Sequence, residues 1–196
     1  MPPIKTNRNS TKKEVIIDKA AQLFMEKGFS ATSMRDLAEK VGVEAASLYN
    51  HIQSKAEILQ IICFRVANFL LEHLEKVENN KQGAIEKIKT ILRFHLWHMI
   101  NNYEEVQVAD REWRHLPEPY LSNFKVQRKN YRQRLAAIIE KGVRCKEVKP
   151  IDPSTAVLIM LHAVSGVESW HRSSQKISAD QLEKDIVLIL VEGLKN

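Results

Sequence analysis

A short stretch of small and polar side chains near residue 50 contains the residue types that contact DNA. Hydroxyl and amide groups can hydrogen-bond to base edges or phosphates, and alanine methyl groups can contact the methyl group of thymine. A tyrosine, an imidazole and an ammonium group are suited to holding phosphates on the flank. The candidate residues of this stretch are Ala45, Ala46, Ser47, Tyr49, Asn50, His51 and Lys55.

Two residues of the preceding segment extend this candidate surface. Ser33 opens an expected helix, where free backbone N–H groups and the helix dipole favour a bound phosphate. Arg35 follows in the same helix and adds a positive charge. Each residue alone also fits an ordinary structural role, because Ser33 can simply cap its helix and Tyr49 can simply pack. The whole set at this spacing favours nucleic-acid binding.

The elements that must position these side chains are two short helices joined by a tight turn, within residues 32–55. Gly42 lies in the turn, where the chain must reverse sharply with a positive φ that glycine tolerates best. Leu37 and Leu48 are expected to pack between the helices, and small Ala38 lets them approach closely. This is the helix-turn-helix arrangement, whose second helix enters the major groove with its N-terminal residues.

Apolar residues recur at helical spacing along nearly the whole chain of 196 residues. No convincing strand pattern and no internal repeat occur, so we predict an all-α fold with about nine helices. The expected helices cover approximately residues 11–27, 33–41, 45–51, 55–78, 84–101, 104–115, 119–146, 153–172 and 178–194. Helices before residue 55 are short and closely joined, whereas those after it are long and amphipathic.

Composition narrows the classes of protein. The formal net charge of +6 permits binding to nucleic acid, acidic lipid or phosphorylated ligands without choosing among them. Two cysteines, Cys63 and Cys145, give no disulfide framework. No apolar run approaches the roughly 20 residues that span a bilayer, and the first thirteen residues lack the apolar segment of a secretion signal. We therefore expect a cytoplasmic protein with no membrane partner.

The segment ATSMRDLAEKVGVEAASLYNHIQSKAEIL resembles the signature of TetR-family transcriptional regulators. Residues 48–52 match an LYxHF-like patch, and residues 54–59 match the SKxxLL pattern that follows it. The resemblance covers about residues 14–60. It departs from the family pattern at Glu44, where a serine is frequent, and at Ile52, where an aromatic residue is usual.

The first thirteen residues contain four basic residues and no acidic one, and we expect them to form a basic arm. The resemblance implies that this arm is followed by a three-helix DNA-binding domain, within residues 1–54, and by a helical ligand-binding and dimerisation domain over residues 55–196. It also implies that Tyr49, His51 and Lys55 touch the DNA backbone. The expected function is that of a ligand-responsive repressor that binds double-stranded DNA at a pseudo-palindromic operator. We do not expect an enzyme.

The last two predicted helices, over residues 153–172 and 178–194, have wider apolar faces than a single core needs. In regulators of this family such helices form a four-helix dimer interface. An ordinary bundle within one chain is the alternative. We expect a homodimer through the last two helices, because two DNA-binding domains are needed to contact a two-fold symmetric operator.

The segment over residues 111–149 contains eleven Lys and Arg but four acidic residues. A solvated charged face is the common interpretation, and the mouth of a site for an anionic ligand is the alternative. The stretch REWRHLPEPYLSNFKVQRKNYRQRL resembles the CoA-thioester-sensing branch of the family, which implies a small apolar or acyl-CoA-like effector. The candidate effector-binding residues are Phe94, Trp97, His98, Met99, Arg111, Trp113, Arg128, Tyr131, Arg132 and Trp170.

Other chemistries have weaker support. His95 and His98 have a spacing that can bind zinc, but no further ligand accompanies them, so we expect no metal site and no cofactor. No nucleophile-elbow, phosphate-loop or zinc-protease motif occurs. Two alternatives remain open: a small helical CoA-ester-binding enzyme that uses Cys145, and a non-enzymatic basic adaptor for acidic membranes or RNA. Both leave the helix-turn-helix motif unexplained.

Overall fold

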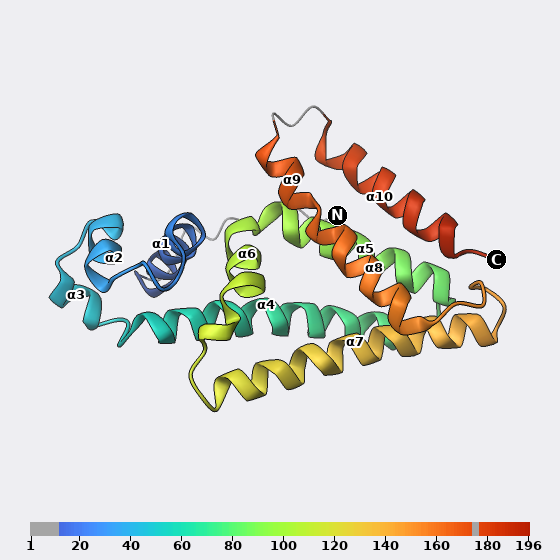
Figure 1. The fold of residues 1–196 in the computed structure, drawn as a ribbon, viewed down its shortest axis with the longest axis horizontal. Coiled ribbons are helices and arrows are strands. Elements are labelled where there is room, and N and C mark those ends of the chain that lie inside the picture. Colours follow the sequence, from blue (N-terminus) through green and yellow to red (C-terminus); the bar gives the residue numbers. More distant parts are fainter. Residues whose placement is uncertain (1–11, 174–176) are drawn as a thin grey trace. The chain divides into compact units, whose positions relative to one another are not determined.

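The computed structural model of the chain describes residues 12–173 and 177–196, and its regular elements in these ranges are all helices (Figure 1). The predicted basic arm lies almost entirely outside the described residues. The helices are α1 (Lys12–Lys27), α2 (Met34–Val41), α3 (Ala45–Tyr49), α4 (Lys55–Glu78), α5 (Ala84–Asn101), α6 (Tyr103–Arg111), the 3-10 helix η1 (Trp113–His115), α7 (Tyr120–Arg144), α8 (Pro153–Ser165), α9 (Val167–Arg172) and α10 (Ala179–Leu194). The predicted all-α fold is confirmed.

Each of the nine predicted segments is helical, and two of them are divided. The segment over residues 153–172 forms α8 and α9, which meet at Gly166. A Cβ atom on Gly166 would lie 3.1 Å from the backbone oxygen of Ala163, so the main chain is crowded at this junction. The segment over residues 104–115 forms α6 and then the single turn η1. Spacing of apolar residues predicts a helical stretch well but does not locate a short interruption inside it.

The chain forms two compact units. The first contains the described residues up to Val66 together with Glu104–Ser122, and the second contains Ala67–Tyr103 together with Asn123–Asn196. Helix α4 is continuous and contributes to both. This division by compactness differs from the predicted boundary at residues 54 and 55, because the first part of α4 and the α6–η1 segment belong to the first unit.

The core of the first unit forms where α1, α2 and α3 meet, with the start of α4. Helix α1 buries one face that includes Ile17 and Phe24, and α2 buries Leu37. The ring of Phe24 meets the ring of Phe29 edge-on, with 5.2 Å between centroids. Burial of such side chains contributes about 1.5–3 kcal/mol each, relative to leaving them exposed. This core fixes the orientation of α2 and α3.

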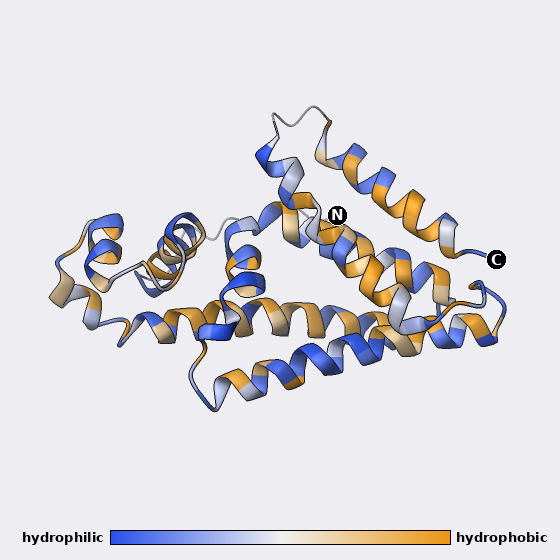
Figure 2. Ribbon diagram, in the orientation of Figure 1, coloured by the Kyte–Doolittle hydropathy of each residue, from blue (hydrophilic) through white to orange (hydrophobic). Residues whose placement is uncertain are grey.

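Helix α5 is central to the second unit and contacts α8, α9 and α10. It buries apolar side chains such as Ile88, Leu92 and Leu96. Apolar and polar residues are interspersed along the helices (Figure 2). Helix α7 adds Leu135 and Ile139 to the buried set. The structure therefore confirms a helical body that follows the helix-turn-helix segment in the chain.

Candidate nucleic-acid interface and effector site

The turn between α2 and α3 has the geometry that the sequence predicts. Gly42 ends α2 with φ 79° and ψ 36°, in the left-handed region. Its N–H donates to the carbonyl oxygen of Ala38 at 2.9 Å, and Val43 N donates to the same oxygen at 3.0 Å. A Cβ atom at residue 42 would meet no atom within 4 Å. Glycine is therefore required here by the backbone angle and not by lack of space.

Helix α3 is held by its buried residues and displays its polar ones. Leu48 and Ile52 are almost completely buried in the core of the first unit. Tyr49 is 53% exposed, and Asn50 ends the helix with an exposed side chain. Ala46 is also exposed, whereas the remaining candidates of this stretch, Ala45, Ser47 and His51, are half-buried. The structure brings these candidates together along α3 and its C-terminal end.

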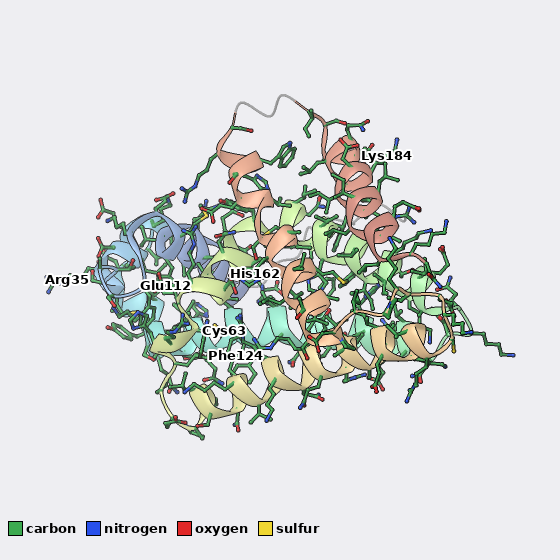
Figure 3. All side chains as sticks on the ribbon, turned by 45° about the vertical axis from the view of Figure 1, so that its right-hand side comes forward. Arg35, Cys63, Glu112, Phe124, His162 and Lys184 are labelled. Atoms are coloured by element: carbon green, nitrogen blue, oxygen red, sulfur yellow. The ribbon has the colours of Figure 1, made fainter. Side chains whose placement is uncertain are left out.

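The start of α2 differs from the open phosphate site that Ser33 predicts. The Ser33 side chain accepts a hydrogen bond from Asp36 N at 3.1 Å, and Ser33 N donates to Asp36 Oδ2 at 2.8 Å. The Ser33 hydroxyl is also hydrogen-bonded to the Asp36 carboxylate, and Lys27 Nζ lies 3.0 Å from Asp36 Oδ1. These hydrogen bonds hold the pKa of Asp36 well below its ordinary value. A carboxylate already occupies the site, while exposed Arg35 extends away from the ribbon (Figure 3).

Lys55 lies at the start of α4 and binds the main chain that joins α1 to α2. Its Nζ atom donates to the carbonyl oxygens of Phe29 at 2.9 Å, Ser30 at 3.2 Å and Thr32 at 2.9 Å. It also lies 4.6 Å from the centroid of the Phe29 ring. All three ammonium donors have acceptors within the first unit, so this placement differs from the phosphate contact predicted from the sequence.

A contact that the sequence does not reveal joins η1 to the same loop. The ring of His115 stacks on the ring of Phe29, with 5.4 Å between centroids and 25° between planes. Glu112 Oε2 lies 3.5 Å from His115 Nε2. Within the first unit, the loop after α1 is therefore held by Lys55 and also contacts η1.

An aromatic and histidine cluster lies between α4 and α5 in the second unit; we call it the α4–α5 cluster. Its members are Phe69, His73, Phe94, Trp97 and His98. The rings of His73 and Phe94 are parallel, with centroids 3.6 Å apart. The Phe69 ring lies 4.9 Å from that of Phe94 and 4.8 Å from that of His98. Sequence reasoning named the three α5 members but missed Phe69 and His73, which come from another helix.

Two neighbouring histidines of α5 are held in different ways. His98 Nδ1 lies 2.9 Å from Asn102 Nδ2, whereas His95 Nε2 is hydrogen-bonded to the hydroxyl of Tyr131 on α7. Burial lowers the pKa of His98 to about 4 and that of His95 to about 3, because loss of water disfavours the charged imidazolium. Burial also raises the pKa of the Tyr131 hydroxyl. At neutral pH these side chains are uncharged.

The other effector candidates do not join this cluster. Arg111 and Trp113 belong to the first unit, where the guanidinium of Arg114 lies 4.6 Å from the Trp113 ring centroid. In the second unit, Arg132 is exposed, Met99 is buried, Arg128 lies over Phe124 and the indole N–H of Trp170 donates to the Ile177 carbonyl oxygen. The structure therefore brings together only part of the predicted effector set.

His95 and His98 are engaged with Tyr131 and Asn102, respectively. Within the ranges that the structure describes, no group of three or more His, Cys, Asp or Glu side chains is placed to hold a metal ion. Cys145 is exposed and Cys63 is buried.

Among the residues that the structure describes, no helix is both long and apolar enough to cross a bilayer.

Helices α8 and α10 present large apolar side chains to solvent. Leu158 and Ile159 on α8 are 57% and 55% exposed, and Leu188 and Ile189 on α10 are 60% and 70% exposed. Large apolar side chains exposed together on two helices favour an interaction site. It is the uncovered surface that the predicted homodimer through the last two helices requires.

Comparison with known proteins places both parts of the chain in one family. Residues 16–62 match the family model for bacterial regulatory proteins of the tetR family, and residues 81–194 match the model for a tetracyclin repressor-like C-terminal domain. The HTH-type transcriptional repressor KstR2 of Mycolicibacterium smegmatis is 20% identical, over 99% of this chain and 96% of its own.

Solved structures share the fold. The ketosteroid transcriptional regulator KstR2 of Mycobacterium tuberculosis has a TM-score of 0.89 at 19% identity, and the match covers 96% of this chain and 97% of that one. AibR in complex with isovaleryl coenzyme A and operator DNA has a TM-score of 0.81 at 21% identity, and the match covers 92% and 98% of the two chains. None of these matches favours the enzyme or the adaptor alternative. The chain belongs to the TetR family of bacterial regulatory proteins and is a DNA-binding transcriptional regulator rather than an enzyme.

Proposed function

We propose that this regulator is a cytoplasmic repressor, which leaves its operator when a small apolar or acyl-CoA-like effector binds in the second unit. The observation that supports DNA binding most directly is that α3 has both buried and exposed residues. Leu48 is buried and fixes the helix, whereas Tyr49 and Asn50 extend from it into solvent. A helix held in this way can enter the major groove without losing its own core contacts.

The exposed groups have separable roles. We assign base contacts to Asn50 and Ser47, with thymine methyl contacts from Ala45 and Ala46. We assign phosphate contacts to three further polar groups of this surface, Tyr49, His51 and Arg35. Ser33 is assigned the cap of α2, because it is already hydrogen-bonded to Asp36. Lys55 is assigned a positioning role through the loop after α1, because its three donors already have carbonyl partners.

The α4–α5 cluster is our proposed effector site. Its planar rings and uncharged histidines suit a largely apolar ligand. Two proteins with the same fold are described as a ketosteroid regulator and as a protein in complex with isovaleryl coenzyme A. We propose an effector from one of these chemical classes, with the exposed arginine Arg132 of α7 available to an anionic group such as the phosphates of CoA.

Release from DNA follows as a population shift. An effector can change operator affinity only if it binds one conformation of the dimer more tightly than the other. Helix α4 begins after α3 at Lys55 and continues without interruption to Glu78, past the residues of the α4–α5 cluster. A displacement of α4 at the cluster would therefore be transmitted along one helix to the residues that position α3.

A gel-shift experiment tests the proposal. The purified protein is titrated against the DNA upstream of its own gene, against a random fragment of equal length, and with isovaleryl-CoA added to the preformed complex. We expect selective binding that weakens steeply with salt, because phosphate contacts release counterions, and release of the DNA by the acyl-CoA. Equal binding to both fragments would contradict sequence-specific regulation.

A further inference from the structure

One buried nitrogen of the α4–α5 cluster has no hydrogen-bond partner. His98 is 6% exposed, and its Nε2 atom is buried without a donor or acceptor within reach among the described residues. An unpaired buried polar group costs about 1–3 kcal/mol. Most buried polar groups in proteins therefore have a hydrogen-bond partner, which can be a bound molecule.

The other ring nitrogen of His98 determines which kind of partner is missing. Asn102 Nδ2 lies 2.9 Å from His98 Nδ1 and 3.5 Å from the backbone oxygen of His98. An amide nitrogen only donates, so His98 Nδ1 accepts from it and is the unprotonated nitrogen. Because the ring is neutral, the proton is on Nε2. The missing partner is therefore a hydrogen-bond acceptor.

The surroundings of His98 restrict the charge of that acceptor. The aromatic neighbours Phe69, Phe94 and Trp97 have ring centroids 4.8 Å, 6.4 Å and 6.4 Å away, and ring faces are only weak acceptors. His73 and His95 both have lowered pKa values because they are buried, so they add no positive charge at neutral pH. An anion here would lose its hydration, and neither of these histidines would compensate its charge. A neutral oxygen does not have this cost.

The cluster is not closed off from the surface of the second unit. Phe69 is 37% exposed, and Phe94 and Trp97 are half-buried. Rotation of exposed side chains occurs within nanoseconds. The exposed Phe69 ring is therefore the part of the cluster that a ligand would displace first.

We propose that the Nε2–H group of His98 donates a hydrogen bond to a carbonyl oxygen of the effector, which is a ketone, ester or thioester with its apolar part against Phe69 and Trp97. This inference rests on the proposed effector site and specifies its chemistry. The carbonyl of an acyl-CoA thioester and the ketone of a steroid both supply the required acceptor. His98 is then the residue that distinguishes such compounds from hydrocarbons of the same shape.

Paired probes with and without carbonyl groups test the inference. The first pair is isovaleryl-CoA and the thioether S-(3-methylbutyl)-CoA, in which a methylene replaces the carbonyl. The second pair is androst-4-ene-3,17-dione and the corresponding steroid hydrocarbon without its two ketones. Neither steroid contains CoA. Binding is measured by calorimetry, and release of DNA by fluorescence anisotropy. We expect the wild-type protein to prefer the carbonyl member of one pair about tenfold, which corresponds to about 1.4 kcal/mol. The pair that shows the preference identifies the source of the carbonyl.

Two substitutions of His98 and one control complete the test. His98→Phe and His98→Leu remove the donor and are expected to abolish the preference, whereas His98→Gln retains a donor and should keep part of it. His73→Phe changes a neighbouring ring of the cluster without removing the unpaired donor. It should shift the affinity for both members of a pair together and leave their ratio near the wild-type value. Melting curves identify any variant that fails to fold, and His98→Gln keeps the test informative if the apolar variants do so.

The outcomes separate this inference from the proposed function. Failure of the wild-type protein to prefer a carbonyl in either pair overturns the inference, and so does an unchanged preference in folded His98→Leu protein. A buried water alone at Nε2 would give these results. Loss of sequence-selective DNA binding in the absence of any probe would instead contradict the proposed function.

Discussion

Lys55 is bound to both the main chain and the ring of Phe29. Its ammonium nitrogen lies 2.9 Å from the Phe29 carbonyl oxygen and 4.6 Å from the centroid of the Phe29 ring. Hydrogen bonds from a charged donor are stronger than neutral ones, at about 1.5–3 kcal/mol. The lysine at the start of α4 therefore fixes the loop between α1 and α2, and through it the orientation of the helix-turn-helix segment.

Replacement of this lysine is expected to act on stability first. Lys55→Ala removes three donors from carbonyl oxygens and should lower the free energy of unfolding by about 1–3 kcal/mol, as measured by urea denaturation. The salt dependence of DNA binding should change little, because no phosphate contact is lost. Arg35→Ala is the matched control, since Arg35 is exposed. It should leave stability within about 0.5 kcal/mol and reduce the salt slope by about one. The reverse pattern would show that Lys55 contacts phosphate.

The helix-turn-helix segment could be predicted from the sequence because its determinants are local. Gly42 marks the turn, Leu37 and Leu48 are placed at helical spacing, and all three lie within twelve residues. The role of Lys55 could not be predicted in this way. Its partners lie 23 to 26 residues earlier in the chain, and no periodic pattern reports on such a contact.

The proposed effector site could also be predicted from the sequence only in part. Residues of α5 could be proposed from their types, but Phe69 and His73 become visible only when α4 is placed beside α5. The pairing of His98 with Asn102 is different, because residues four apart lie on the same face of a helix. That contact could have been found from the sequence. The unpaired Nε2 atom could not, because burial depends on the whole fold.

Replacement of two glycines by alanine measures the cost of a left-handed backbone in the absence of any steric clash. Gly42 has a positive φ, and Gly193 lies near the end of α10; an added Cβ atom would meet nothing within 4 Å at either position. Gly42→Ala should therefore destabilise the protein by about 1–2 kcal/mol through the left-handed backbone alone. Gly193→Ala should stabilise it by up to about 1 kcal/mol. Thermal unfolding of both variants provides the measurement, and equal shifts of Tm would refute the assignment of strain to Gly42.

The pH dependence of stability should depend on His98. Burial lowers its pKa from 6.5 to about 4, so between these values the unfolded chain binds a proton that the folded chain does not. Stability must then fall as pH decreases through this window and level off below it, and the whole difference corresponds to about 3 kcal/mol. Urea denaturation at pH 7 and pH 5 should show a smaller loss for His98→Gln than for the wild-type protein. An identical loss in both would mean that His98 titrates normally in the folded state.

The exposed faces of α8 and α10 are expected to be covered in the dimer. Ile189→Glu places a charge where the side chain is 70% exposed in one chain. Burial of that charge between two subunits is costly, so the variant should be monomeric by light scattering and should bind the operator weakly. Val126→Glu is the control, because Val126 on α7 is similarly exposed, at 67%. A monomeric Val126→Glu variant together with a dimeric Ile189→Glu variant would place the interface elsewhere.

The central claim is that α3 contacts base edges through Asn50 while Tyr49 contacts the backbone. Fluorescence anisotropy of both alanine variants against a panel of single-base operator variants tests it most directly. We predict that Tyr49→Ala weakens binding to every sequence by a similar factor. Asn50→Ala should instead lose about 1–3 kcal/mol of discrimination at one symmetric pair of positions. A uniform loss for Asn50→Ala, equal on operator and random DNA, would contradict the claim.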